Sequence, residues 1–314
     1  INAAAVANPV SVAAVALLSS PQRAVSEEEF VEQLGHLVWL LKGQHYSDLQ
    51  YIPEPAPKAI AEWSTPIAGI RRLPHAWGDL LALTEREAVL LTYNRNNIQH
   101  LFALPSLIAN LFRTRGVLPE EFVITGCRAL YPFLRTEFFL RWSTDEVAEA
   151  ARTCLEVMLK LGLISRRDNG DLCRPDVGTP AFSTLAMLGR VMSETLERYC
   201  MTILMLSEQR KSEKPLQRDR FEQDCQLLAE RMAILTGRDA PEFFDKALFR
   251  GHLSTLIAVG LVTQNADGKL DVDARIERIA ERSMELWSDE ARQTLLQLLM
   301  RRHAPVVAAP ATAG

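Results

Sequence analysis

The six histidines are the side chains in this sequence best suited to act as a general base near neutral pH. A catalytic histidine usually relies on a carboxylate that orients its ring, and an acid five positions further along can fill that role. The residues five positions after the histidines are Leu41, Gln50, Leu80, Pro105, Ile257 and Ala308, none of which is acidic. His75 and Asp79 lie four positions apart, but they flank Trp77 and Gly78 in a stretch where helical spacing cannot be assumed. The sequence therefore predicts no catalytic residue in this chain.

The chain also lacks the short motifs that bind nucleotides or metals or that present a serine nucleophile. It contains no G-x-G-x-x-G, G-x-x-x-x-G-K-[ST], G-x-S-x-G or H-E-x-x-H string. Its five cysteines form no C-x-x-C pair, which favours reduced thiols that fill apolar space. They are Cys127, Cys154, Cys173, Cys200 and Cys225. We therefore expect no cofactor and no metal site.

One polar cluster, residues 93–100, lies between two apolar runs. Its candidate binding residues are Tyr93, Arg95, Asn96 and His100. In one explanation Arg95, with Asn96 or His100, faces a phosphate, a thioester or a neighbouring domain, because a guanidinium donates bidentately to such groups. In the other, the cluster is a helix junction whose polar side chains satisfy backbone groups, with Asn96 or Asn97 as the N-cap. The sequence alone leaves both open.

Helix signals dominate the pattern. Ser26 with Glu29 and Thr84 with Glu87 form capping boxes, and the first opens a helix with apolar residues at helical spacing that ends at Gly43. Strand signals are sparse. The sequence therefore predicts a mainly α, multi-helical fold.

The few strand signals occur in a repeated context. Residues 155–164 match residues 253–262, and the following Gly170 and Gly268 match in register. Each copy predicts a helix, a left-handed glycine cap, a short strand, an Asn-Gly or Asp-Gly turn and a second strand. We expect two helix-plus-β-wing repeats of the winged-helix type.

These signals predict an order of segments along the chain. A helical segment covers 1–43 and a Pro-rich, irregular linker covers 44–80. A helical block with the first wing covers 81–176, and a second block with a wing and a final helix covers 177–302. The Ala/Pro/Val-rich residues 303–314 are expected to be a disordered tail.

Charge and hydropathy narrow the function classes. The net charge is −4 and the sequence pI is about 6.0, which argues against nucleic acid as a main partner. The uncharged start contains only a short apolar run at 9–18, whereas a spanning helix needs about 20 apolar residues. We expect no transmembrane helix. Contact with a membrane surface remains open, for example through residues 199–206, which can equally form a buried core helix.

Several strings resemble the C-terminal region of the bacterial membrane-associated glycerol-3-phosphate acyltransferases. They are INAAAVANPV (1–10), YNRNNIQH (93–100) with LPSL (104–107), LRW (140–142) and APEFFDKA (240–247). The resemblance extends over almost the whole chain. Asn94 departs from it, since the family usually has a second tyrosine there.

The resemblance implies that this chain is a piece of a longer enzyme whose catalytic domain lies upstream and carries a His-x-x-x-x-Asp motif. That enzyme acylates position 1 of glycerol 3-phosphate from acyl-CoA or an acyl carrier protein thioester. The product, lysophosphatidic acid, begins phospholipid synthesis. The piece itself is expected to be inactive.

The expected role is that of an accessory helical region, peripheral to the cytoplasmic face of the bacterial inner membrane. It would pack on its own upstream acyltransferase domain through residues 1–18 and 93–100, and help to hold the enzyme at the membrane surface. A winged-helix interaction or DNA-binding protein is the alternative, although fold alone does not fix function.

Overall fold

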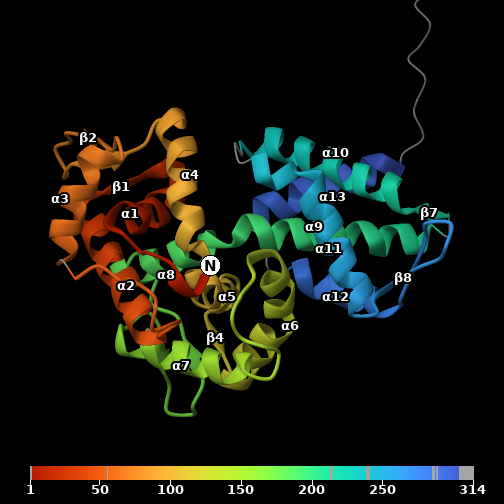
Figure 1. The fold of residues 1–314 in the computed structure, drawn as a ribbon, viewed down its shortest axis with the longest axis horizontal. Helices are drawn as coiled ribbons and strands as arrows, with labels where there is room; N and C mark the ends of the chain where they lie inside the picture. The colour runs from red at the N-terminus through yellow and green to blue at the C-terminus, as the bar shows by residue number, and fades with distance from the viewer. Residues whose placement is uncertain are drawn as a thin grey trace, which may run out of the picture. The chain divides into compact units, whose positions relative to one another are not determined.

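The computed structural model describes residues 2–54, 56–212, 215–237, 241–284, 287 and 289–303. Beyond His303, the expected disordered tail lies outside the described residues. The chain divides into two compact units, residues 1–195 and 196–314 (Figure 1). Both are built mainly of helices with small sheets, which confirms the predicted fold class.

The first part of unit 1 consists of three α-helices and a small three-stranded sheet. Its elements are α1 (Pro9–Leu18), β1 (Ala24–Ser26), α2 (Glu27–Gln44), α3 (Pro57–Ile67), β2 (Arg71–Leu73) and β3 (Leu80–Ala82). All pairs in the sheet are antiparallel, and the strand order is β1-β3-β2. Strands β2 and β3 form a hairpin wing.

The same order of elements recurs twice further along the chain. The second copy is α5 (Ala103–Leu111), β4 (Val117–Leu118), α6 (Glu120–Phe138), α7 (Val147–Lys160), β5 (Ser165–Arg166) and β6 (Leu172–Cys173). The third is α9 (Ser193–Lys211), β7 (Leu216–Gln217), α10 (Arg218–Thr236), α11 (Lys246–Ala258), β8 (Val262–Gln264) and β9 (Lys269–Val272). Their sheet orders, β4-β6-β5 and β7-β9-β8, match that of the first copy. These two copies are the two predicted wing repeats.

The third helix of every copy ends in the same backbone conformation. The glycines at this point, Gly69, Gly162 and Gly260, have φ of 67°, 68° and 71°. The next residue donates its N–H to the carbonyl five positions back, as in a Schellman motif. The chain then leaves the helix in the direction of the wing strand.

The first copy corrects the expected irregular linker at 44–80. That segment contains α3 and most of the first wing, and α3 packs on α1 and α2. Prolines suggested an irregular chain, but Pro57 occupies the first turn of α3, where its missing N–H costs nothing. The helix before it also ends one residue beyond the expected Gly43, with His45 as a left-handed cap.

The described elements that lie outside the three copies complete the two units. They are η1 (Asn2–Ala4), η2 (Pro21–Arg23), α4 (Glu85–Gln99), η3 (His100–Phe102), α8 (Pro180–Val191), η4 (Pro241–Phe244), α12 (Arg275–Ser283) and α13 (Asp289–His303). We expected a new block from residue 177, but α8 packs on α5 and belongs to unit 1. The other domain limits stay predictions.

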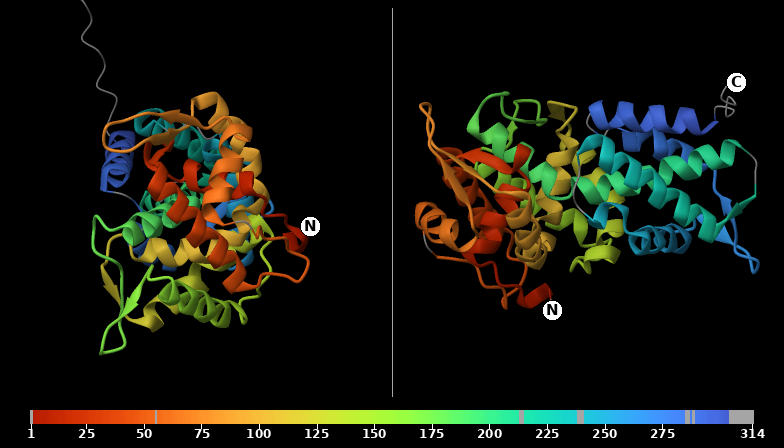
Figure 2. Two further views of the ribbon diagram at one scale, coloured as in Figure 1. Left: turned by 90° about the vertical axis from the view of Figure 1, so that its left-hand side faces the viewer. Right: turned by 90° about the horizontal axis from the view of Figure 1, so that it is seen from above.

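Helix α1 packs among α2, α3 and α4 in unit 1 (Figures 1 and 2). Every residue from Val12 to Leu17 is fully buried. A helix that is apolar on all sides belongs inside a core. Residues 11–17 of the expected docking segment 1–18 are therefore unavailable to a partner, whereas Ala3, Ala4 and Val6 are exposed, and docking through them stays a prediction.

Residues 199–206 are also buried, so the candidate membrane segment is a core helix instead. Nearby, the buried Arg198 donates from Nη1 to the backbone oxygen of Glu242 at 3.1 Å. This bond fixes η4, where Phe243 is fully buried. The APEFFDKA string thus joins η4 to α11, and the Asp245 carboxylate caps α11 by accepting from the Ala247 N–H.

Gly43 lets α2 approach α7 closely, because a Cβ on Gly43 would lie 2.6 Å from Val157 Cγ2 and 2.8 Å from Cγ1. Gly43→Ala gains about 1 kcal/mol of helix propensity. It also overpacks the contact, which costs about 1–3 kcal/mol. We expect the free energy of unfolding to fall by roughly 1 kcal/mol in urea titrations.

Two further variants separate the gain in helix propensity from the cost of overpacking the contact between α2 and α7. A Cβ on Gly251, inside α11, meets no atom within 4 Å, so Gly251→Ala should stabilise the chain by about 0.5–1 kcal/mol. In a Val157→Ala background, Gly43→Ala should also become stabilising. If Gly43→Ala alone stabilises as much as Gly251→Ala, the close approach of α2 and α7 is incorrect.

Candidate functional site

The four residues of the predicted polar cluster do not converge on one point. Tyr93 and Asn96 project from α4 into solvent, and Tyr93 is 74% exposed. Arg95 donates from Nε and Nη2 to Oδ1 of Asn96, at 3.2 and 3.1 Å. His100 is buried at the other end of the segment. The arrangement forms no anion-binding pocket.

The helix junction lies slightly beyond the expected position. Helix α4 continues through Gln99, so neither Asn96 nor Asn97 is an N-cap, which corrects that part of the alternative. Gln99 and His100 bind backbone groups instead. Gln99 Nε2 donates to the Val191 oxygen at 2.8 Å, and His100 Nε2 lies 3.3 Å from the Asn2 oxygen. The junction thus joins α4 to distant segments of unit 1.

Tyr46 is the centre of this meeting point, which we call the start junction. Its ring makes edge contacts with His100 and Trp142, at centroid distances of 5.6 and 5.3 Å. Its hydroxyl accepts the Arg141 N–H at 2.9 Å, and the Arg141 guanidinium donates to the Tyr46 carbonyl. Asn2 Nδ2 donates to the Phe138 oxygen at 2.6 Å. The start junction therefore joins residues from three of the strings that carry the resemblance.

Exposed apolar side chains surround the start junction. Val6 pairs with Tyr51 through a parallel β-bridge, and both side chains are about half exposed. Phe139, whose carbonyl accepts from Asn2, is 81% exposed. We call Val6, Leu49, Tyr51 and Phe139 the junction surface.

Phe139 is unusual in its backbone as well as its exposure. It caps α6 in the left-handed conformation, with φ of 51°. That conformation costs a non-glycine residue roughly 1–2 kcal/mol, and glycine is the usual occupant of such a cap. Neither the cap nor the core requires a phenylalanine here, so the fold does not explain this side chain.

His45 contacts an acid on the exposed surface of the chain. His45 Nε2 lies 2.9 Å from Asp48 Oδ1, with both side chains largely exposed. His75 and Asp79 are not paired, because Asp79 accepts from Arg72 at 3.2 Å and His75 Nδ1 accepts the Trp77 N–H. Neither His45 nor His75 is therefore a buried base oriented by a carboxylate.

Two further histidines, the half-buried His36 and the buried His252, have structural surroundings. His36 Nδ1 lies 3.1 Å from Thr184 Oγ1, and burial lowers the pKa of His36. The His252 ring stacks on Tyr199 at a centroid distance of 4.2 Å. Burial, and then the nearby Arg198, lower the pKa of His252 to about 3. Such a ring stays neutral in the core and is a poor proton acceptor.

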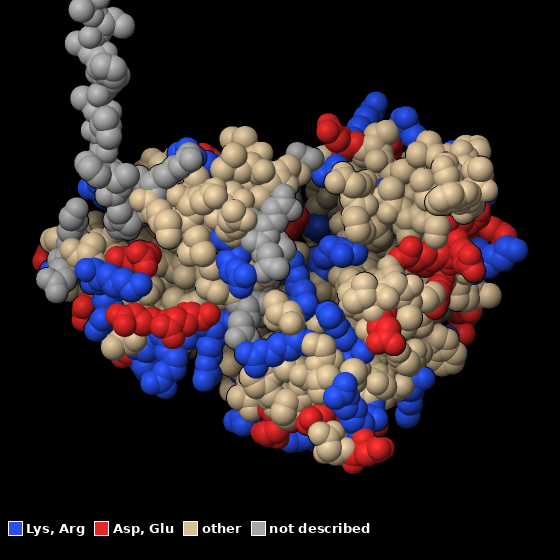
Figure 3. Space-filling view, turned by 180° about the vertical axis from the view of Figure 1, so that it is seen from behind, with Lys and Arg blue, Asp and Glu red and all other residues tan. Residues whose placement is uncertain are grey.

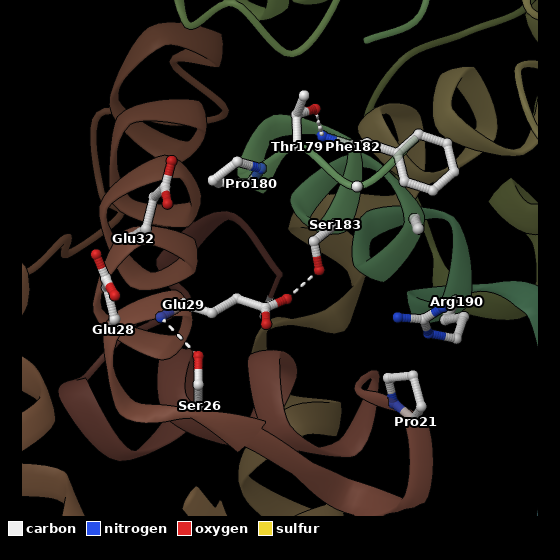
Figure 4. Close-up of a pocket in the computed structure, with 12 residues that line it drawn as sticks. Pro21, Ser26, Glu28, Glu29, Glu32, Thr179, Pro180, Phe182, Ser183 and Arg190 are labelled. Carbon is white, nitrogen blue, oxygen red and sulfur yellow. Dashed lines mark hydrogen bonds between the residues drawn. The ribbon is translucent and has the colours of Figure 1, made fainter. Parts of the chain in front are cut away.

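A pocket of about 580 Å³ lies between the first turns of α2 and α8 in unit 1 (Figure 4). Helix α2 contributes Glu28, Glu29 and Glu32 to one wall. Ser183 of the opposite wall donates its hydroxyl to Glu29, and Arg190 donates from Nε to the Ser19 carbonyl.

The electrostatics of this pocket disfavour a phosphorylated ligand. Burial raises the pKa of Glu32, and the charges of Glu28 and Glu29 raise it further. Arg190 is the cation among the lining residues. Burial and then Arg113 lower its pKa to about 10. An anion that entered would face carboxylates and a partly desolvated guanidinium.

Metal and nucleic-acid sites are not supported in the part of the chain that the structure describes. No group of three or more His, Cys, Asp or Glu side chains there could hold a metal ion. Figure 3 shows acidic side chains lying among the basic ones over much of one face. A winged-helix order of elements does not by itself imply DNA binding.

Comparison with known proteins decides the family. The family model described as "Glycerol-3-phosphate acyltransferase C-terminal region" matches residues 1–265. The chain belongs to this family. Two relatives named glycerol-3-phosphate acyltransferase, from Pseudomonas paraeruginosa (strain DSM 24068 / PA7) and Pseudomonas aeruginosa (strain UCBPP-PA14), are each 34% identical over 310 residues. These alignments cover 98% of this chain and 37% of each relative.

A third glycerol-3-phosphate acyltransferase, from Pseudomonas savastanoi pv. phaseolicola (strain 1448A / Race 6), is 35% identical over 281 residues. That alignment covers 90% of this chain and 33% of the relative. The chain thus spans about a third of the length of the curated relatives it matches. The family resemblance inferred from the strings is confirmed.

Sequence reasoning identified parts of the start junction without connecting them. His100, Arg141 and Trp142 belong to strings that carry the resemblance to the acyltransferase C-terminal region. Tyr46, which holds them together, lies outside those strings. Its only sequence cue is an aromatic residue just after a helix, which is too common to predict a contact over 95 residues.

His252 predicts a pH dependence of stability. The unfolded chain binds a proton near pH 6.5, whereas the folded chain does so only near pH 3. The stabilisation is therefore complete above about pH 6.5 and is lost as the pH falls towards 3. We expect His252→Phe, which keeps an aromatic ring beside Tyr199, to reduce the slope of unfolding free energy against pH by up to about 1.4 kcal/mol per unit.

Urea titrations between pH 7 and 4 measure this slope. Trp39→Phe, at an exposed position without a titrating side chain, is the control and should leave the slope unchanged. An unchanged slope in His252→Phe would show that the ring takes up a proton as easily when folded as when unfolded.

Proposed function

We propose that this chain is the accessory C-terminal region of a glycerol-3-phosphate 1-O-acyltransferase, and that it supports the reaction without performing it. The reaction joins an acyl group from acyl-CoA or an acyl carrier protein to glycerol 3-phosphate and gives lysophosphatidic acid. The family membership supports the first part of the proposal. The surroundings of His36, His45, His75 and His100 support the second, because none of them pairs with a carboxylate in a pocket.

The acyl-transfer machinery then belongs to the remaining two thirds of such an enzyme. The matched family model is that of a C-terminal region, so we place that machinery upstream of Ile1. The acidic pocket between α2 and α8 is unsuited to glycerol 3-phosphate and to the phosphates of coenzyme A. Its carboxylates would repel both.

The junction surface is the face through which this region would pack on the upstream acyltransferase domain. Its residues Val6, Leu49, Tyr51 and Phe139 are exposed, and they belong to segments that the contacts of the start junction hold in place. Phe139 keeps a strained backbone that a glycine would relieve. An aromatic side chain retained at such a position is well explained by a partner that buries it.

Association with the membrane would be peripheral in this region. No helix in the described ranges is long and apolar enough to cross a bilayer. An enzyme that makes a lipid from a soluble and an acyl-bearing substrate benefits from a position at the membrane surface. We place this region at the cytoplasmic face of the inner membrane.

An activity assay tests the absence of catalysis. The 314-residue chain is incubated with radiolabelled glycerol 3-phosphate and either palmitoyl-CoA or an acyl carrier protein thioester. We expect lysophosphatidic acid at the background level, because no general base is positioned. The full-length Pseudomonas aeruginosa relative, assayed in parallel, is the positive control. Turnover by the chain alone would show that it contains an active site.

Binding of the chain to the acyltransferase part of that relative tests the junction surface. Phe139→Gly should raise the free energy of unfolding by up to about 1 kcal/mol by relieving the left-handed cap. It should nevertheless weaken binding several-fold, because a buried aromatic anchor is lost. Tyr51→Asp should weaken binding further.

Val177→Asp is the matched control, since Val177 is also well exposed in unit 1 but lies in another segment. Binding affinities come from calorimetry, and stabilities come from urea titration. If Phe139→Gly and Val177→Asp bind equally well, the junction surface is not the docking face.

A further inference from the structure

The three wings have equivalent places in the repeated fold but different tips. The second and third wings turn through Asn169-Gly170 and Asp267-Gly268, with polar side chains around them. The first turns through residues 74–79, which carry Trp77. Trp77 is 94% exposed, the highest value among the exposed large hydrophobic side chains. Because the other two wings fold with polar turns, the wing itself does not require this tryptophan.

The first wing tip is ordered by its own hydrogen bonds. His75 Nδ1 accepts the Trp77 N–H at 3.2 Å, and the His75 carbonyl accepts the Gly78 N–H at 3.1 Å. The His75 and Trp77 rings meet edge to face, with centroids 6.3 Å apart. The loop therefore presents the indole in one orientation. It also satisfies these two backbone donors internally, which lowers the cost of removing them from water.

The strands beneath the tip continue the apolar surface. Leu73 and Leu80 are directly paired across the hairpin, and both are exposed. Their neighbour Leu81 points to the other face and is buried. One face of the hairpin thus carries Leu73 and Leu80 next to the tip and Arg71 at the base, and in the right-hand view of Figure 2 this hairpin reaches away from the helices of unit 1.

The charges around the hairpin are arranged as pairs. Arg72 binds both Glu27 and Asp79, so the acid next to the tip is neutralised. Arg71, whose side chain is mostly exposed, lies 3.8 Å from Glu87 at the base of the hairpin. Both guanidiniums at the base of the hairpin are thus paired with carboxylates, so insertion would rest on the apolar tip and not on attraction to headgroup phosphates.

We propose that the first wing, through Trp77, Leu73 and Leu80, inserts into the headgroup region of a lipid membrane. Tryptophan favours this region because its ring is apolar and its N–H can remain hydrogen-bonded. The proposal deepens the peripheral membrane association described above and rests on it.

The size of the surface favours lipid over a protein partner. A tryptophan buries about 150–250 Å², and two leucines beneath it add to that area. A stable protein interface buries about 800 Å² on each partner. A narrow hairpin tip falls well short of this value, whereas a fluid lipid surface needs only a few inserted side chains.

Flotation of the 314-residue chain with vesicles of phosphatidylethanolamine and phosphatidylglycerol tests the proposal. We expect Trp77→Ser to lower the partition coefficient roughly tenfold or more. Trp39→Ser is the matched control, because Trp39 is an exposed tryptophan on α2 with Lys42 above its ring, and it should bind normally. Circular dichroism melting confirms that both variants fold.

Quenching by brominated lipids supplies an independent measurement. The tryptophan fluorescence of the unaltered chain should be quenched on binding, and Trp77→Phe should lose most of that quenching while still floating. Trp39→Phe should retain it.

The outcomes distinguish a failure of the wing proposal from a failure of membrane association. Equal flotation of the unaltered chain and Trp77→Ser would overturn the wing insertion and leave peripheral association intact. No flotation of the unaltered chain would overturn both. If Trp77→Ser instead loses binding only to the acyltransferase part of a relative, the wing contacts protein and the lipid proposal is wrong.

Discussion

A single backbone constraint determines how each repeat of this chain folds. The third helix has to stop so that the chain can form a hairpin, and the second strand of that hairpin pairs antiparallel with the strand that precedes the second helix. Gly69, Gly162 and Gly260 allow this by adopting a left-handed conformation that a side chain would strain. The hydrogen bond across each glycine then aims the following apolar residue into the core. The wings, and every surface they carry, depend on these turns.

The same constraint explains how much of the fold could be predicted. Gly162 and Gly260 were recognisable because regular apolar helices precede them and Asn-Gly or Asp-Gly turns follow. Gly69 has the same role, but Pro66 and the Pro74–Asp79 turn conceal the pattern. Local propensity was a poor guide there, because burial of Ile60 and Ala61 against α1 and α2 stabilises α3 despite its prolines. Helices were predictable from local spacing, whereas this copy depends on tertiary packing.

The start junction could not be predicted for a related reason. Asn2, Tyr46, His100 and Trp142 come from segments separated by up to about 140 positions, and no periodicity links them. Only the folded core of α1, α4 and α5 brings these segments together. The resemblance named three of the strings, but it gave no reason why they should be neighbours. Their common location suggests that those strings share one role, which is to hold the face on which Phe139 is displayed.

The features that the fold leaves unexplained are contact surfaces, not reactive groups. Phe139 sits at a cap that glycine would occupy with less strain, and Trp77 sits at a turn that its sister wings form with polar residues. Buried histidines are kept neutral by the core, and the pocket carboxylates would repel phosphates. A catalytic domain shows the opposite pattern, since its unexplained residues are charged groups held in clefts. In this chain the departures from a minimal fold are exposed aromatic rings on rigid supports. That distribution fits the proposed role in contact with other surfaces, and none of His36, His45, His75 and His100 lines the pocket between α2 and α8.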